Sequence, residues 1–283
     1  MYNFDFKKTL GQNFLKDDNI VNKIVNATEY KKNNLVIEIG PGAGSLTKKL
    51  LPKVDKAILY EIDTRLERIL NKELAEYDNY TIIFDDFLNR NVNDDLSNYC
   101  FDNLYIVANL PYYITTPIIM KLIEDRLDIE SITVMIQKEV ADRLIEIPGG
   151  KNTGAITYTV YYYCTSKKIM EVPNTSFIPE PEVTSEIIKM DLRYKPVVDV
   201  ENPQIMFRII KSAFMQRRKT LLNALTNANV FINKEQGINT LKELNLKENV
   251  RAEELTIQDF SNITKIVFGK LKGKKGTDPK LPF

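Results

Sequence analysis

The chain has 283 residues, of which 43% are hydrophobic and 27% charged, and its formal net charge is +1. This composition is typical of a globular protein with one large domain and a smaller one. There is no histidine, and Cys100 and Cys164 are the only cysteines. Imidazole triads and histidine-containing zinc sites are therefore excluded, and we expect neither a metal nor a disulfide framework. No apolar run is long enough to span a bilayer, and residues 1–8 hold no apolar signal core. We therefore expect a cytoplasmic protein without a membrane partner.

Helical patterns alternate with apolar runs through the first half of the sequence. The first is a helix at residues 18–26, with Ile20, Val21 and Ile24 on one side. The strands expected after it are residues 35–39, 57–60, 80–84, 104–108 and 132–136, and the other expected helices are residues 46–51, 65–75, 117–126 and 138–145. Alternation of this kind predicts an α/β fold, with a parallel sheet covered by helices.

The second half predicts a different architecture. Residues 155–164 are rich in Thr, Val and Tyr, so propensity alone favours a strand, and residues 167–172 and 186–192 look like a strand pair flanking a proline-rich loop. After Pro196, helices are expected at residues 205–225, 237–244 and 259–271, the last capped by Thr256 with Asp259 three residues on. We therefore expect a first domain at residues 1–196, a small all-helical domain at residues 197–271 and a disordered tail at residues 272–283.

The segment VIEIGPGAGSLTKKL places Gly40, Gly42 and Gly44 between a predicted strand and a predicted helix. Glycines at such a point let a ligand approach the backbone. The dinucleotide fingerprint GxGxxG is the obvious alternative. However, position 45 is Ser, and Pro41 lacks an N–H that a pyrophosphate would use. A cofactor without phosphates fits this loop better, and S-adenosylmethionine is such a cofactor.

Acidic residues follow the next two predicted strands. Glu61 closes the second strand, where a carboxylate accepts hydrogen bonds from ribose hydroxyls in NAD and S-adenosylmethionine sites alike. Asp86 follows the third strand, and its carboxylate can accept from an adenine amino group, with Phe87 close to the ring. The alternative is that Asp85 and Asp86 are turn residues, which is the better interpretation of Asp86 taken alone. The glycine loop followed by an acid at the next strand tip nevertheless predicts a cofactor site.

The fourth predicted strand ends in Asn109-Leu110-Pro111-Tyr112. An aromatic amino group such as N6 of adenine is a poor nucleophile, because its lone pair is delocalised into the ring. The side-chain oxygen of Asn109 and the backbone carbonyl of Leu110 can accept its hydrogens and favour a pyramidal nitrogen, while Pro111 stiffens the peptide. The ring face of Tyr112, rather than its hydroxyl, is expected to stack on the base. This pattern predicts catalysis by orientation and electrostatics; the alternative is a proline-stopped strand with a surface tyrosine.

NLPY has the form of the fourth motif of adenine-N6 methyltransferases. Further segments resemble, in order and spacing, the ribosomal RNA adenine N6,N6-dimethyltransferase family of the small ribosomal subunit. They are LGQNFLKD at residues 10–17, EIGPGAGSLT at 38–47, MIQKEVADRL at 135–144, FIPEPEVTS at 177–185, AFMQRRKTLLNAL at 213–225 and RAEELT at 251–256. The resemblance covers the chain except its tail. It implies a Rossmann-like, class I S-adenosylmethionine-dependent methyltransferase sheet with a small C-terminal helical domain, and a helix rather than a strand at residues 155–164.

The resemblance also implies roles for individual residues. The cofactor, S-adenosylmethionine, would be bound by Asn13, Leu15, Gly40, Gly42, Glu61, Asp86 and Asn109. The catalytic residues would be Asn109, Leu110, Pro111 and Tyr112, with Phe177 facing the target adenine opposite Tyr112. Pro179 and Pro181 stiffen the loop of Phe177, which suits one side of a stacking clamp, and a core phenylalanine is the alternative. Many family members are basic in this loop, whereas Glu180 and Glu182 flank Pro181 here, which weakens the expectation of a phosphate contact.

Basic residues gather in an acid-free stretch of the predicted helix at residues 205–225. They are Arg208, Lys211, Arg217, Arg218 and Lys219. On a continuous helix, residues 208, 211, 218 and 219 fall near one face, with residue 217 beside it. This predicts a track for RNA phosphates, with a solvated helix face as the alternative.

The function implied by the resemblance is methylation of N6 in two adjacent adenines of a hairpin loop near the 3′ end of small-subunit (16S) ribosomal RNA. The expected partner is that RNA within an assembling 30S particle, and the protein is expected to be a monomer. Two alternatives stay open. One is a large-subunit ribosomal RNA adenine N6-methyltransferase that confers antibiotic resistance. Those enzymes carry Asn-Ile-Pro-Tyr at the strand tip, whereas this chain has Leu110 in place of the isoleucine. The other is a non-enzymatic ribosome assembly factor.

Overall fold

The computed structural model describes residues 14–15, 17–150, 152–216 and 218–272. The chain divides into two compact units. The sheet unit contains the described residues up to Asp142 together with Thr165–Leu192, and the helical unit contains Arg143–Cys164 together with the described residues from Arg193 onward. Within these ranges, none of the helices has both the length and the apolar character needed to span a bilayer.

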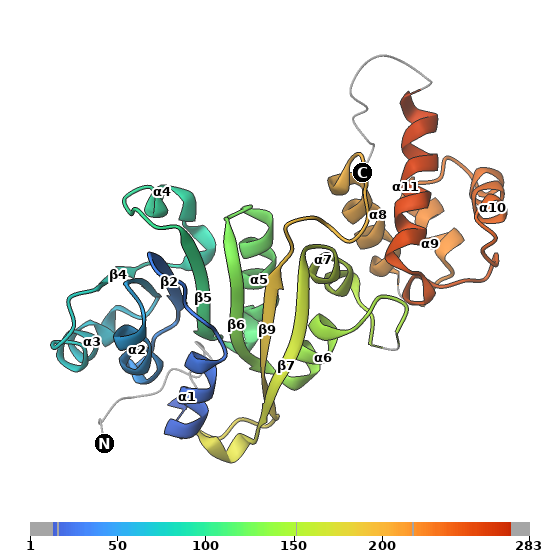
Figure 1. The fold of residues 1–283 in the computed structure, drawn as a ribbon. Helices are drawn as coiled ribbons and strands as arrows, with labels where there is room; N and C mark the ends of the chain where they lie inside the picture. The colour runs from blue at the N-terminus through green and yellow to red at the C-terminus, as the bar shows by residue number, and fades with distance from the viewer. Residues whose placement is uncertain (1–13, 16, 151, 217, 273–283) are drawn as a thin grey trace. The chain divides into compact units, whose positions relative to one another are not determined.

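The sheet unit is built on a sheet with seven strands among the described residues, in the order β4-β3-β2-β5-β6-β9-β7 (Figure 1). The strands are β2 (Asn34–Ile39), β3 (Lys56–Glu61), β4 (Tyr80–Phe84), β5 (Asn103–Asn109), β6 (Ile129–Gln137), β7 (Cys164–Val172) and β9 (Ser185–Leu192). β2 to β6 pair in parallel, and β9 runs antiparallel to β6, with Ser185 opposite Gln137. The predicted parallel sheet is confirmed, and its topology brings the loops after β2, β3, β4 and β5 to one edge.

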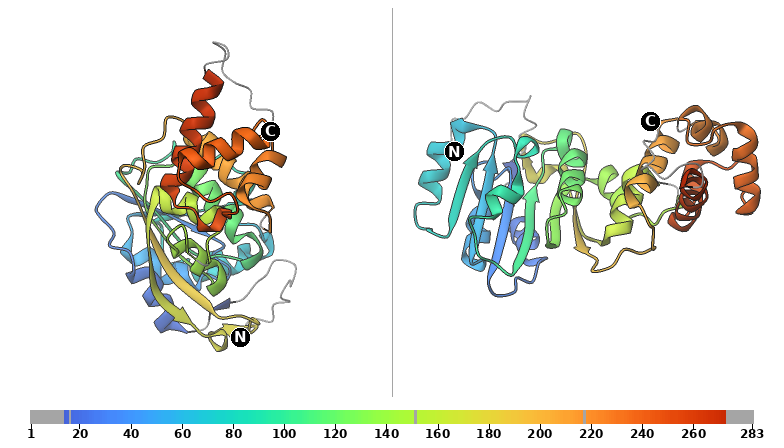
Figure 2. Two further views of the ribbon diagram at one scale, coloured as in Figure 1. Left: turned by 90° about the vertical axis from the view of Figure 1, so that its right-hand side faces the viewer. Right: turned by 90° about the horizontal axis from the view of Figure 1, so that it is seen from above.

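Helices cover both faces of this sheet. They are α1 (Asp18–Asn26), α2 (Ser45–Leu50), α3 (Glu67–Glu73), α4 (Val92–Leu96), α5 (Thr115–Glu124) and α6 (Lys138–Ile145), and Figures 1 and 2 show α5 on the opposite face from α1. Ile20 and Ile24 of α1 share one core cluster with Val36, Leu59 and Val107 of the strands. β2 is buried along its whole length, as its apolar run predicts for a central strand.

A second, two-stranded sheet joins segments that are far apart in the sequence. β1 (Phe14–Leu15) pairs antiparallel with β8 (Phe177–Ile178), and Leu15 lies opposite Phe177. β8 follows a short 3-10 helix, η6 (Asn174–Ser176). The chain near the start of α1 is thereby fixed to the loop that connects β7 with β9.

The helical unit contains α7 (Ala155–Tyr163), α8 (Pro203–Met215), α9 (Leu221–Asn227), α10 (Lys234–Glu243), the 3-10 helix η7 (Ala252–Glu254) and α11 (Ile257–Lys272). α7 confirms the helix that the resemblance implies and contradicts the strand that propensity favours. The reason lies in its packing. Tyr158 is fully buried in the core of this unit, and its hydroxyl donates to the carbonyls of Ala252 (3.0 Å) and Leu255 (2.7 Å).

The unit boundaries and the cap of α11 can be compared with the sequence analysis. Residues 143–164 group with the helical unit, whereas the sequence-based boundary at residue 196 places them in the first domain. The contacts of Tyr158 account for this difference. The predicted cap is confirmed, since the N–H of Asp259 donates to Oγ1 of Thr256 (3.2 Å) and the N–H of Thr256 donates to Oδ2 of Asp259 (2.8 Å).

The prediction of one continuous helix at residues 205–225 is wrong. α8 ends at Met215, and Gln216 has φ −118° and ψ 54°, outside the helical region. Thr220 adopts an extended conformation and caps α9, with its Oγ1 accepting from the N–H of Asn223 (3.4 Å). The N–H of Leu221 donates to the carbonyl of Val250 (2.8 Å). A cap and a tertiary backbone contact thus override a local pattern that favours helix throughout.

Candidate active site

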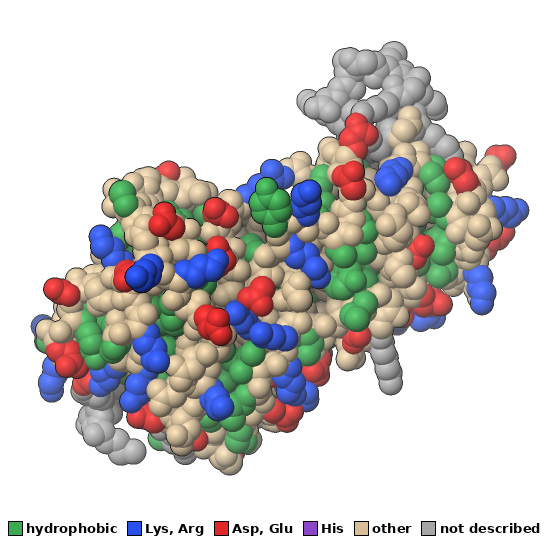
Figure 3. All heavy atoms as spheres, in the orientation of Figure 1, with side chains coloured by type: hydrophobic (Ala, Val, Ile, Leu, Met, Phe, Trp, Pro, Cys, Tyr) green, Lys and Arg blue, Asp and Glu red, His purple; other side chains and the backbone are tan. Residues whose placement is uncertain are grey.

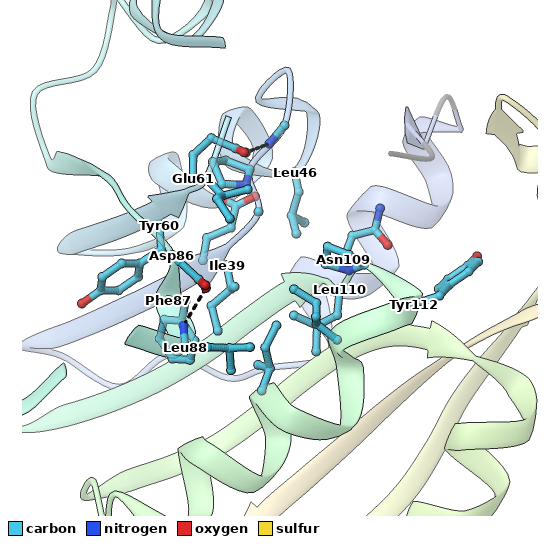
Figure 4. Close-up of a pocket in the computed structure, with 18 of the residues that line it drawn as sticks. Ile39, Leu46, Tyr60, Glu61, Asp86, Phe87, Leu88, Asn109, Leu110 and Tyr112 are labelled. Carbon is cyan, nitrogen blue, oxygen red and sulfur yellow. Dashed lines mark hydrogen bonds between the residues drawn. The ribbon is translucent and has the colours of Figure 1, made fainter. Parts of the chain in front are cut away.

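A pocket opens at the edge of the sheet where the loops after β2, β3, β4 and β5 meet (Figure 4). Open parallel sheets bind their ligands at this edge. Of the residues assigned to a cofactor in the sequence analysis, those that line the pocket are Leu15, Gly40, Gly42, Glu61, Asp86 and Asn109. The remaining one, Asn13, lies outside the described residues. Segments from five parts of the chain are therefore gathered around one pocket, and their role in cofactor binding stays a prediction.

The loop after β2 turns sharply, and glycines make this turn possible. Gly40, Gly42 and Gly44 have φ angles of 73°, 59° and 83°, in the left-handed region that residues with a side chain rarely adopt. The N–H of Gly44 donates to the carbonyl of Pro41 (2.9 Å) and closes the turn at the start of α2. A Cβ atom at Gly40 would lie 3.9 Å from Cδ of Pro111. A ligand therefore meets backbone at Gly40 and Gly42, close to the turn that follows β5.

Glu61, at the end of β3, is held in place by backbone amides. It is buried, its Oε2 accepts from the N–H of Gly42 (3.0 Å), and its Oε1 accepts from the N–H of Asp63 (2.9 Å). Burial raises the pKa of Glu61, and these amides oppose the rise. Each carboxylate oxygen has two lone pairs, so both oxygens can accept a further hydrogen bond. Glu61 can thus accept from ribose hydroxyls while it fixes the glycine loop, a second task that the sequence does not reveal.

Asp86 caps a turn and also lines the pocket. It precedes the 3-10 helix η4 (Phe87–Asn89), where its Oδ1 accepts from the N–H of Leu88 (3.0 Å) and its Oδ2 accepts from Nδ2 of Asn89 (3.0 Å). This is the turn-capping role. Asp86 also lines the pocket, and Figure 4 shows it at the same end as Glu61. The capping bonds orient the carboxylate and leave lone pairs for a ligand.

Glu38 is a pocket residue that the sequence analysis did not single out. It lies within the otherwise apolar β2, is 1% exposed, and its Oε2 has no hydrogen-bond partner among the described residues. Burial raises the pKa of Glu38 to about 8, while the Thr47 hydroxyl lowers it and the charge of Glu61 raises it further. The sequence did contain a signal for Glu38, namely an acidic residue within an apolar strand. Burying a charged group is costly, so an acid at such a position needs a partner that compensates the cost.

S-adenosylmethionine fits the groups that line this pocket. Its cationic groups match Oε2 of Glu38, which lacks a partner among the described residues, its ribose hydroxyls match Glu61, and its adenine amino group matches Asp86. It carries no phosphate, so the N–H that Pro41 lacks is not needed. Among the described residues, no cluster of three or more Cys, Asp or Glu side chains could hold a metal ion.

The Asn109–Tyr112 turn forms the other end of the pocket. The N–H of Leu110 donates to the carbonyl of Met135 in β6 (3.1 Å). The carbonyl of Pro111 accepts from the N–H of Ile114 (3.3 Å) and from Oγ1 of Thr115 (3.0 Å), which ties the turn to the start of α5. Figure 4 shows Tyr112 beyond Asn109, away from Glu61 and Asp86. The backbone that carries the predicted acceptors is therefore held by two neighbouring elements.

Phe177 does not line this pocket in the structure. It is 2% exposed and belongs to the core cluster that also contains Leu15, Ile24 and Ile187. The pairing of β8 with β1 holds Phe177 opposite Leu15 and buries its ring. Phe177 therefore occupies a core position in the structure, and its role opposite Tyr112 stays a prediction.

The predicted basic track is not a single helical face. Arg208 and Lys211 are exposed on α8, whereas Arg218 and Lys219 are exposed in the turn between α8 and α9, and Arg217 lies outside the described residues. The N–H of Lys219 donates to the carbonyl of Gln216 (2.8 Å) and shapes this turn. Figure 3 shows Lys and Arg side chains interspersed with Asp and Glu on the face that it presents. The role of the exposed basic residues of α8 and of the following turn in RNA binding stays a prediction.

Comparisons with known proteins identify the family of this chain. The family model described as ribosomal RNA adenine dimethylase matches residues 3–268. A ribosomal RNA small subunit methyltransferase A from Bacillus pumilus is 44% identical over 270 residues, covering 94% of this chain and 92% of the relative. The protein of the same name from Clostridioides difficile is 42% identical over 274 residues, covering 96% of this chain and 94% of the relative.

Two solved structures have a similar fold. A dimethyladenosine transferase from Plasmodium falciparum has a TM-score of 0.75 at 29% identity, covering 90% of this chain and 97% of its own. The 23S rRNA methyltransferase ErmE has a TM-score of 0.68 at 21% identity, covering 90% of this chain and 100% of its own. Both support the class I methyltransferase fold expected from the sequence. With a family model that spans most of its length and relatives above 40% identity, this chain belongs to the ribosomal RNA adenine dimethylase family.

Proposed function

We infer that this protein is an S-adenosylmethionine-dependent enzyme that dimethylates N6 of adenine in small-subunit ribosomal RNA. The observation that carries this conclusion is the family match over residues 3–268, which includes the pocket as well as the helical unit. The relatives from Bacillus pumilus and Clostridioides difficile are named for the small subunit. The likeness to ErmE, at 21% identity, supports only a common fold, so the small-subunit activity is favoured over the large-subunit alternative.

The residues of the pocket have distinct tasks in this reaction. When bound, S-adenosylmethionine supplies an electrophilic methyl group. Glu61 and Asp86 bind and orient the cofactor from one end of the pocket, and Glu38 binds its cationic groups. At the other end, the side-chain oxygen of Asn109 and the carbonyl of Leu110 accept the amino hydrogens of the adenine, which favours a pyramidal nitrogen with its lone pair available. Tyr112 provides a ring on which the base stacks. Catalysis is by positioning and electrostatics, which is consistent with a chain that has no histidine.

The finer points of the substrate form part of the same proposal. We place the reaction at two adjacent adenines of a hairpin loop near the 3′ end of 16S ribosomal RNA. The enzyme acts in the cytoplasm, as a monomer, on an assembling 30S particle. Arg208, Lys211, Arg217, Arg218 and Lys219 bind RNA phosphates. The described members of this set are exposed and lie on α8 or in the turn after it, without an acid between them in the sequence, which supports the proposal.

Mass mapping of methylated adenines in ribosomal RNA tests this function directly. Cells without the protein should lack N6,N6-dimethyladenosine at two adjacent positions of the small-subunit RNA, and the purified enzyme should restore it with S-adenosylmethionine. Loss of a mark in large-subunit RNA would instead support the antibiotic-resistance alternative. Calorimetry separates the non-enzymatic alternative, because an assembly factor without activity should not bind S-adenosylmethionine.

A further inference from the structure

The hydroxyl of Tyr112 has a specific partner in the structure. Its oxygen lies 2.5 Å from Oγ of Ser185, a residue 73 positions later in the chain. Tyr112 belongs to the turn after β5, whereas Ser185 is the first residue of β9. The contact therefore joins two elements of the sheet unit that the local sequence does not relate.

Ser185 is a rigid anchor for this contact. It is fully buried and stands opposite Gln137 in the antiparallel pairing of β9 with β6. The N–H of Lys138 donates to the carbonyl of Thr184 (3.0 Å), which fixes the chain just before it. A buried hydroxyl requires a hydrogen-bond partner, and the Tyr112 hydroxyl satisfies that requirement. Burial also raises the pKa of Tyr112, against a smaller lowering by Ser185, so the phenol remains protonated at neutral pH.

The backbone of Tyr112 is fixed separately from its ring. Pro111 has φ −59°, and its carbonyl accepts from Ile114 and Thr115 at the start of α5. These contacts set the position of the Tyr112 Cα atom but leave rotation about its side-chain bonds undetermined. The hydrogen bond to Ser185 removes that freedom, because it holds the far end of the ring. The ring is thus attached at one end to α5 and at the other to β9.

We propose that Ser185 is a positioning residue for methyl transfer, which holds the ring of Tyr112 through its hydroxyl in the orientation on which the target adenine stacks. This inference rests on the proposed function. It also assigns a task to the Tyr112 hydroxyl, whereas the sequence alone points only to the ring face. A ring that is already oriented loses less side-chain entropy when the base arrives, and a small error in the position of a reacting group lowers the rate disproportionately.

A double-mutant cycle on the full chain tests the proposal. The variants are Tyr112→Phe, Ser185→Ala and the two together, assayed by single-turnover methylation with saturating RNA and cofactor. A neutral hydrogen bond contributes about 0.5–1.5 kcal/mol, so each single variant should react roughly three- to tenfold more slowly. The double variant should be no slower than either single one, because both remove the same contact. The dissociation constant of S-adenosylmethionine should not change.

Two controls distinguish orientation from a general effect on the fold. Ser185→Thr keeps the hydroxyl and Ser185→Val has nearly the same shape without it, so only the threonine variant should approach the wild-type rate. The hydroxyl of Tyr99 donates to Oγ1 of Thr81 at 2.8 Å, away from the pocket. Tyr99→Phe removes a tyrosine hydroxyl contact at the surface, outside the pocket, so it should keep the wild-type rate.

The outcomes also separate this inference from the proposed function. If the wild-type enzyme methylates adenine and Tyr112→Phe is equally fast, the inference is overturned and the function stands. Additive losses in the double variant, or equal rates for Ser185→Thr and Ser185→Val, would likewise overturn it. If the wild-type enzyme leaves adenine unmethylated, the proposed function fails, and this inference fails with it.

Discussion

Gly42 donates its backbone N–H to Oε2 of Glu61, with 3.0 Å between the two atoms, and so joins the loop after β2 to the tip of β3. The carboxylate proposed to bind the ribose is therefore also the group that holds the glycine loop. Its removal should disturb the pocket at two places.

Glu61→Ala should weaken S-adenosylmethionine binding at least about tenfold, because hydrogen bonds to a charged acceptor contribute about 1.5–3 kcal/mol. Isothermal titration calorimetry measures the affinity. Glu130→Ala is a matched control, since Glu130 pairs with Lys31 on the surface (2.8 Å) and does not line the pocket. Equal affinities for the two variants would remove Glu61 from the cofactor site.

Cofactor affinity should rise with pH. The pKa of Glu38 is raised to about 8 by burial in the ligand-free protein, and a cationic ligand favours its ionised form, which lowers that pKa in the complex. Binding therefore releases a proton below about pH 8, and affinity should increase from pH 6 and level off above 8. Calorimetry in buffers of different ionisation enthalpy counts the protons. The isosteric Glu38→Gln should bind more weakly and lose most of this dependence, and a wild-type affinity independent of pH contradicts the assignment.

The same pKa has a consequence for stability. An unfolded glutamate releases its proton near pH 4.5, whereas the folded, ligand-free protein keeps the Glu38 proton up to about pH 8. Because the folded state binds more protons between these values, Glu38 makes the ligand-free protein less stable as the pH rises through this range. Glu38→Gln should remove that contribution, which denaturant unfolding at pH 5 and pH 8 can measure.

Asn109→Ala should lower the methyl-transfer rate far more than it lowers RNA affinity. The lost acceptor acts on the reacting nitrogen, so it matters most in the transition state. By comparison with removal of one preorganised polar group from an active site, the rate should fall on the order of a hundredfold. Asn103→Ala, at the opposite end of β5, should leave the rate unchanged. Near wild-type turnover by Asn109→Ala would mean that the turn serves only to end the strand.

Charge reversal should distinguish an RNA-binding surface from a solvated one. Arg218→Glu with Lys219→Glu should raise the RNA dissociation constant and flatten its salt dependence, because phosphate contacts release counterions. Lys234→Glu with Lys242→Glu, exposed residues of α10 in the same unit, changes the net charge equally. Fluorescence anisotropy at several salt concentrations compares the pairs, and indistinguishable salt slopes would show that residues 218 and 219 contact no phosphate.

Gly237→Ala should destabilise the helical unit. A Cβ atom there would lie 2.4 Å from Cδ1 of Leu222 and 2.8 Å from Cδ2 of Phe231, and both of these side chains belong to the core. Overpacking costs about 1–3 kcal/mol, which outweighs the gain in helix propensity of up to about 1 kcal/mol. Gly269→Ala is the control, because a Cβ atom there meets nothing within 4 Å. Urea unfolding should show opposite changes for the two variants, and a stabilised Gly237→Ala would contradict this packing.

Much of the catalytic architecture follows from local sequence. Apolar runs that end in Gly40, Glu61 and Asn109 correspond to strands of a parallel sheet, and the carboxyl ends of such strands meet at one edge whatever the helices between them do. Three glycines with positive φ angles could be anticipated because few other residues tolerate that conformation. The proline after Leu110 identified the end of a strand because it has no N–H to donate to a neighbouring strand. These features depend on residues that are neighbours in the sequence, so they can be predicted without knowledge of the fold.

Other features depend on contacts between distant parts of the chain, and only the folded molecule decides them. The helix predicted at residues 205–225 breaks at Gln216, and Leu221 is held by the carbonyl of Val250. Phe177 is buried because β8 pairs with β1. Tyr112 meets Ser185 only because β6 carries β9 to the turn after β5. At the helix break, long-range contacts outweigh a local preference of a few tenths to about one kcal/mol per residue. The surroundings of Phe177 and Tyr112 depend on strand pairing between distant segments, which is why they could not be assigned from the sequence.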